Sequence, residues 1–143
     1  MSKRGKLMDN SNIFNQYFYE VLDDMEDLAR DSYSEPEDEH EKDVLDFCKK
    51  LKDAINQMDQ NEAFYFSFVK YISDLTVTER DILFNSIAVP FYEIWKDFLL
   101  NVDEPQEKRV NVFATCLAAE YIIRTMDDYF GFSYFKNKEK EDD

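Results

Sequence analysis

Residues 110–126 read VNVFATCLAAEYIIRTM, and this stretch decides the fold class. Its apolar residues keep helical spacing on two sides. One face carries Val110, Ala114, Leu117, Ala118, Tyr121 and Ile122, and the other carries Val112, Cys116, Ala119, Ile123 and Met126. A helix that is apolar on two sides is surrounded by other elements. The sequence therefore predicts a bundle with this helix at its centre, opened by Asp103 and closed by Gly131.

Two amphipathic segments fill the first third of the chain. The first is predicted to begin at Asn10 or Ser11, since either side chain can cap a helix, and its apolar positions continue to residue 29. The second is predicted to begin at Ser34, because Ser34 and Glu37 have the spacing of a capping box. Its apolar stripe ends near Met58.

Two more segments lie between residue 61 and the C-terminal helix. Asn61 is predicted to cap the third helix, although the phenylalanines at 64, 66 and 68 alternate as they would in a strand. Helix is favoured because no partner strand is apparent elsewhere. The fourth helix is predicted to be capped by Thr78, and Pro90 is expected to kink or split it.

The composition supports one helical domain. A chain of 143 residues suits a single domain with an ordinary core, and 2 Gly and 3 Pro are too few for the many turns of a sheet protein. We therefore expect an all-α, single-domain bundle over residues 1–143. It has five helices, or six if the proline splits the fourth. Residues 1–10 and 136–143 are polar and are predicted to be mobile tails.

The charge of the chain restricts its partners. The net charge is −15, from 17 basic and 32 acidic side chains. Such a chain repels nucleic acid and anionic membrane surfaces, and it attracts basic proteins. The basic N-terminus is followed by only two apolar residues before a polar run, so we expect no secretion signal here. The sequence predicts a cytoplasmic protein that binds neither nucleic acid nor membrane directly.

The acidic residues are concentrated between residues 20 and 46, where thirteen acids face two bases. We predict a docking surface for a basic protein made of Glu20, Asp23, Asp24, Asp27, Asp31, Glu35, Glu37, Asp38, Glu39, Glu41 and Asp43; Glu26 and Asp46 are the other two acids. Carboxylates on one helix face stand about 5–6 Å apart, and phosphates in a DNA strand about 3.4 Å apart along the axis. A groove built for phosphates could therefore accept this surface. A solvated helical corner without a partner is the alternative.

No arrangement of residues indicates catalysis or a cofactor. Glu37 and His40 have the Glu-x-x-His spacing of di-iron bundles, but that site needs a second histidine and the chain has one. A weak single-metal site with Glu41 is the remaining alternative. Residues 75–83 resemble the opening of helix-turn-helix regions in bacterial regulators, which implies a basic recognition helix next. Here the following helix is aromatic and acidic, which argues against DNA binding.

The cysteines and aromatic residues complete the prediction. Cys48 and Cys116 lie in apolar helical patterns and are expected to be buried, reduced thiols. The chain has 13 Phe and 9 Tyr, and among them Tyr17, Phe18 and Phe135 could anchor a partner or a second copy of the chain. The sequence thus predicts a non-enzymatic acidic inhibitor, of the DNA-mimic or immunity type. The runner-up is a scaffold or regulatory subunit that associates through its aromatic residues.

Overall fold

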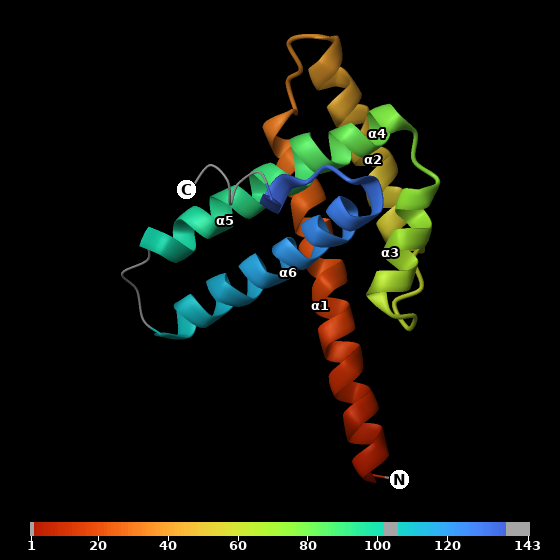
Figure 1. Cartoon of the computed structure of the whole chain (residues 1–143), viewed down its shortest axis with the longest axis vertical. Coiled ribbons are helices and arrows are strands. Elements are labelled where there is room, and N and C mark those ends of the chain that lie inside the picture. Colours follow the sequence, from red (N-terminus) through yellow and green to blue (C-terminus); the bar gives the residue numbers. More distant parts are fainter. Residues whose placement is uncertain (1, 102–105, 137–143) are drawn as a thin grey trace.

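A computed structural model describes residues 2–101 and 106–136, with side-chain positions from 14 to 101 and from 108 to 136. The elements are α1 (Ser2–Ser32), α2 (Glu39–Gln57), α3 (Phe64–Ser73), α4 (Val77–Asp81), the π-helical segment η1 (Ile82–Ala88), α5 (Val89–Asn101) and α6 (Gln106–Phe130). The described residues contain no strand, and 64–73 are helical. The predicted all-α bundle is confirmed (Figure 1).

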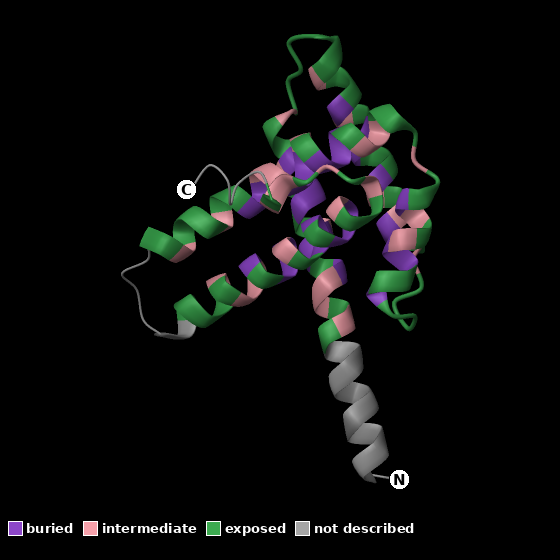
Figure 2. Cartoon of the chain, viewed as in Figure 1, coloured by how far each residue is buried: buried purple, intermediate pink, exposed green. Residues whose placement is uncertain are grey.

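Two helices share the centre of the bundle. The second half of α6 is buried as predicted, through Cys116, Ala118, Ala119, Ile122, Ile123 and Met126. The prediction that α6 is surrounded on both sides is wrong, because Val110, Leu117 and Tyr121 of the first predicted face are exposed. The long helix α1 contacts α2, α3, η1, α5 and α6, so it is as central as α6 (Figures 1 and 2). Its buried face includes Leu22, Met25 and Ala29.

The predicted beginnings of the first two helices are wrong. α1 begins at Ser2, so the helix includes residues 2–10; Met1 and residues 137–143 lie outside the described part of the chain. α2 begins at Glu39, because the extended backbone of Asp38 lets its carboxylate accept a hydrogen bond from Glu41 N at 2.9 Å. Ser34 lies in the connection between the two helices.

The cap of α3 comes from another helix. Ala63 occupies the N-cap position and has no side-chain acceptor, so Asn61 is not the cap. Instead Asn15 of α1 accepts a hydrogen bond from Phe64 N. The same side chain donates to Gln60 O and Glu62 O, each at 2.7 Å. One asparagine therefore caps α3 and fixes the α2–α3 connection on α1.

The region around Pro90 is helical throughout. Thr76, not Thr78, caps α4, and Thr76 and Glu79 form a capping box. Pro90 neither ends nor splits the helix, because the preceding segment η1 has a wider π-helical winding in which Val89 N donates to Phe84 O. This winding accommodates a residue that cannot donate to the carbonyl four positions earlier.

The remaining predictions concern the end of α6 and the cysteines. Gly131 ends α6 with φ 77°, and its N–H donates to Asp127 O at 2.8 Å, as a left-handed cap requires. The predicted opening residue Asp103 lies outside the described residues. Cys48 and Cys116 are both buried and free, as predicted.

Candidate functional site

The acidic surface begins on α1. Glu20, Asp24, Asp27 and Asp31 are all exposed, and their spacing of four, three and four residues places them on one helix face. We call these four residues the acidic stripe. It extends about 16 Å along α1, at 1.5 Å per residue. The opposite face of the helix carries Leu22 and Met25 into the core, so core packing fixes the direction in which the stripe points.

The surface continues through the α1–α2 connection into the first turns of α2. Glu35, Glu37, Asp38, Glu39 and Asp43 are exposed, and Glu41 is half-buried. This connection lies at one end of the molecule, far from the N-terminus of α1 (Figure 1). Asp38 uses one carboxylate oxygen to cap α2. The structure therefore exposes most of the predicted acids along α1, in the connection and in the first turns of α2.

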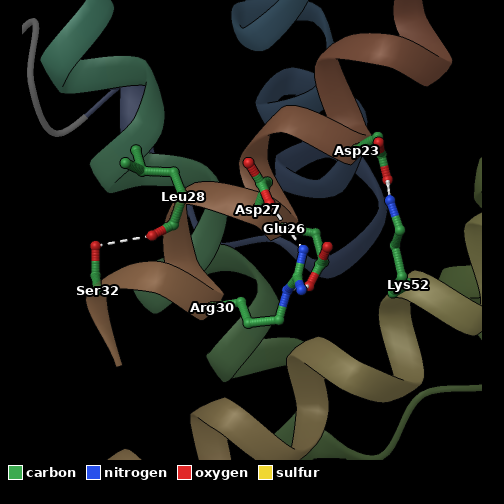
Figure 3. Close-up of polar contacts among 7 residues, drawn as sticks. All are labelled: Asp23, Glu26, Asp27, Leu28, Arg30, Ser32 and Lys52. Carbon is green, nitrogen blue, oxygen red and sulfur yellow. Dashed lines mark hydrogen bonds and ion pairs between the residues drawn. The ribbon is translucent and has the colours of Figure 1, made fainter. Parts of the chain in front are cut away.

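Asp23 is the exception among the predicted residues. Its Oδ1 accepts a 2.6 Å hydrogen bond and ion pair from Lys52 Nζ of α2, and both side chains are about one third exposed (Figure 3). Asp23 therefore joins α1 to α2, where the sequence pattern had placed it facing solvent. Its negative charge is balanced by Lys52 and is not part of the acidic stripe.

The sequence pattern missed the role of Glu26. This carboxylate is 0% exposed, and its Oε2 accepts a 2.9 Å hydrogen bond from Arg30 Nε. Arg30 also binds Asp27 at 2.7 Å, so the guanidinium lies between a buried and an exposed carboxylate (Figure 3). The other oxygen of Glu26 has no hydrogen-bond partner among the described residues. The spacing of Glu26, four residues after Leu22 and three before Ala29, was the available signal, since it puts Glu26 on the buried side.

The acids of α1 affect one another's protonation. Partial burial raises the pKa of Asp24, and the neighbouring charges of Asp23, Glu20 and Asp27 raise it further, while Lys52 lowers it. Burial likewise raises the pKa of Glu26, although Arg30 acts in the opposite direction. The ionised form of each group is therefore disfavoured in the folded protein. A nearby positive charge from outside the chain would relieve this repulsion at Asp24.

The sequence also singled out three aromatic residues as anchors for a partner and His40 as a possible metal ligand. Tyr17, Phe18 and Phe135 are half-buried and pack against the core, so they are not the exposed aromatic residues of this chain. A hollow of about 430 Å³ is lined instead by Phe14, Phe18, Phe64, Tyr65 and Tyr121, together with polar residues. His40 is exposed, and the described residues contain no group of three or more His, Cys, Asp or Glu side chains placed to hold a metal ion.

Comparison of this chain with protein-family models, with curated proteins and with solved structures gives no match. Among the helices of the described segments, none combines the length and the apolar character needed to cross a membrane.

Proposed function

We propose that this chain is a non-enzymatic, acidic binding protein that inhibits a partner by occupying its basic, nucleic-acid-binding surface. The observation that carries the proposal is the exposure of nine carboxylates along α1, in the connection and at the start of α2: Glu20, Asp24, Asp27, Asp31, Glu35, Glu37, Asp38, Glu39 and Asp43. Such a concentration of one sign of charge attracts a basic surface over a distance and accelerates association.

The mutual repulsion of these acids supports the proposal. Acids that raise one another's pKa, as around Asp24, make the folded protein less stable than a mixed-charge surface would. A solubility role needs only scattered charges of both signs. A docking surface for a basic partner needs concentrated negative charge. When the partner binds, its positive charges relieve the repulsion between the acids.

The rigidity of the surface also supports it. The acidic stripe lies on a helix that contacts five other elements, and α2 is joined to it by the ion pair between Asp23 and Lys52. Carboxylates held on packed helices lose little freedom on binding, so more of the electrostatic attraction remains as affinity. A DNA strand also presents regularly spaced charges, at about 3.4 Å per phosphate.

The test uses the chain as an affinity matrix for proteins of its native host. The double variant Asp24→Lys, Asp31→Lys reverses two residues of the acidic stripe that make no ion pair among the described side chains. The matched control Asp53→Lys, Asp74→Lys makes the same change in net charge at exposed positions of α2 and of the end of α3. We expect a basic protein to bind wild type and control, to fail on the stripe variant, and to be released by salt and by duplex DNA.

Two results would contradict the proposal. One is a partner that binds the stripe variant as tightly as the control. The other is a partner whose binding is unaffected by salt and by DNA. Either would favour the second candidate function, a scaffold or regulatory subunit. That candidate has an observation of its own, because Phe14, Phe66 and Phe113 are more than half exposed.

A further inference from the structure

One hollow of the surface carries a concentration of aromatic rings. It lies where α1, α3 and α6 meet, three helices that contact one another (Figure 1). We call it the aromatic hollow, and its rings are Phe14, Phe18, Phe64, Tyr65 and Tyr121. Its volume of about 430 Å³ lies in the range of small-ligand sites, about 300–1,000 Å³. No residue of the acidic stripe lines it, so it is a separate candidate site.

The floor of the aromatic hollow is held in place by packing. Phe64 is 2% exposed, and its ring centroid lies 5.5 Å from that of Phe18 and 5.2 Å from that of Phe68. Asn15 also lines the hollow, and its hydrogen bonds to two carbonyls hold the α2–α3 connection on α1. A site built from packed helices and a fixed connection needs little reorganisation to accept a ligand.

The rim of the hollow presents aromatic rings to solvent. Phe14 of α1 is 69% exposed, Tyr65 of α3 47% and Tyr121 of α6 37%. Three rings that are far apart in the sequence thus border one hollow, and only the fold brings them together. A hollow bordered by exposed apolar rings marks an interaction site.

The charge around the hollow favours a cation. Each of the described residues that line it is uncharged. The connection that borders it, residues 58–63, carries Asp59 and Glu62 and no base. The face of an aromatic ring is negative and attracts a cation within about 6 Å of the ring centre. The net charge of −15 adds to this attraction, so a cation fits the hollow better than an anion or a neutral group of the same size.

The lining also selects the kind of cation. A primary ammonium or a guanidinium carries N–H groups that must find acceptors when they leave water. The described residues that line the hollow include no carboxylate to accept them. A trimethylammonium group has no N–H and needs only ring faces, and clusters of aromatic rings are the usual way in which proteins bind it.

We propose that the aromatic hollow binds a trimethylammonium group, as the head of a trimethylated lysine side chain of another protein. Small-molecule sites cover about 70–90% of the surface of their ligand. Here the rings of the rim are 37–69% exposed, so the hollow encloses the head and leaves the rest of the ligand in solvent. Such partial cover fits a side chain that projects from a protein better than a free molecule such as choline. This inference does not depend on the proposed function, because it uses a different surface.

The first test compares ligands that differ in one feature. The probes are N-acetyl-trimethyllysine amide, its neutral isostere with carbon in place of the ammonium nitrogen, the unmethylated lysine compound, and choline. Each is titrated into the wild-type chain by NMR at high salt, which screens the general attraction of cations to an acidic protein. The trimethyllysine compound should bind at least about twofold more tightly than the isostere and the unmethylated lysine, as expected for a contact between a cation and ring faces.

Three outcomes of this titration would count against the proposal. Equal binding of the neutral isostere would show that the hollow is apolar without a preference for cations. Equal binding of unmethylated lysine would remove the selection for methyl groups. Tighter binding of choline than of the trimethyllysine compound would assign the hollow to a free small molecule and overturn the protein-borne ligand.

The second test removes one ring of the rim at a time. Phe14→Leu and Tyr65→Leu keep an apolar side chain and should each weaken binding of the trimethyllysine compound about two- to fivefold. Both positions are exposed, so the fold should be retained, which melting temperatures check. Tyr65→Phe keeps the ring and should bind as wild type does. Phe113→Leu is the matched control, because Phe113 is a 51% exposed ring of α6 outside the hollow. Equal weakening by Phe113→Leu, or no weakening by either rim variant, would overturn the proposal and leave the acidic docking surface unaffected.

Discussion

Arg30 covers the buried carboxylate of Glu26 and separates it from solvent, with Nε 2.9 Å from Oε2. The carboxylate is fully buried, whereas the arginine side chain is 44% exposed. The pair therefore lies at the edge of the α1 core face, where one partner has lost its hydration and the other has kept much of it. Burial raises the pKa of Glu26 more than Arg30 lowers it. Such a pair contributes less stability than its geometry suggests.

Glu26→Met should make the stability of the protein less dependent on pH. A carboxyl whose pKa is raised by folding stabilises the folded state fully below its unfolded pKa, about 4.3, and this contribution is lost as the pH rises through the folded pKa. Methionine cannot ionise and fills a similar volume. Urea midpoints measured from acid to neutral pH should fall less for Glu26→Met than for wild type. The exposed-site control Glu35→Met should follow wild type; parallel curves for all three proteins would contradict the assignment.

Asn15→Ala should destabilise the fold by about 0.5–2 kcal/mol, the usual range for loss of a helix cap. The substitution removes the acceptor for Phe64 N and both hydrogen bonds to the α2–α3 connection. Asn61→Ala is the matched control, because Asn61 is exposed and does not cap α3. Denaturant unfolding measures the free energy of unfolding of both variants, and we expect a loss for Asn15→Ala only. Equal losses of stability would mean that Asn61, which is close to α3 in sequence, stabilises the fold as much as Asn15 does.

The thiol of Cys48 should be unreactive in the folded protein. Burial raises its pKa to about 11, and the nearby Glu26 carboxylate also raises it. Since the thiolate is the reactive form, a thiol reagent at mildly alkaline pH should label Cys48 only after denaturation. The exposed neighbour Lys49→Cys should be labelled at once. Mass spectrometry of the labelled peptides reads out both sites, and rapid labelling of folded Cys48 would contradict its burial.

Helical periodicity predicted the fold class because it depends on many residues at once. The apolar spacing of residues 110–126 identified a long helix and the buried part of its surface. Periodicity could not distinguish burial by the bundle from an apolar face left exposed, so Val110, Leu117 and Tyr121 were predicted to be buried although they are exposed. The spacing is the same in both cases. Only the three-dimensional arrangement shows where the neighbouring helices end.

Helix starts were predicted less well, because capping depends on backbone conformation and on distant groups. Ser34 and Thr78 have suitable side chains, but Asp38 and Thr76 have the extended backbone that a cap requires. The cap of α3 comes from Asn15, 49 residues away from Phe64, which no local pattern can reveal. The acidic region was predicted as a whole from composition. The separate roles of Asp23 and Glu26 could not be predicted in this way. They depend on the pairing of Asp23 with Lys52 and of Glu26 with Arg30, which only the structure shows.

Asp24→Asn should stabilise the fold and slow association with a basic partner. The pKa of Asp24 is raised by partial burial and then by the charges of Asp23, Glu20 and Asp27. Its contribution to stability is therefore present at low pH and is lost as the pH rises through the folded pKa. Asparagine cannot ionise, so the melting temperature at neutral pH should rise above that of wild type, and the difference should disappear in acid.

The same substitution removes one charge from the acidic stripe. If the stripe guides a basic partner, Asp24→Asn should lower the association rate at low salt and have little effect at high salt, where the charges are screened. Asp53→Asn is the control, because it removes one exposed charge from α2 outside the stripe. A trade of stability for association is expected of a functional surface. A variant that gains stability while its association rate equals that of the control would show that Asp24 takes no part in docking.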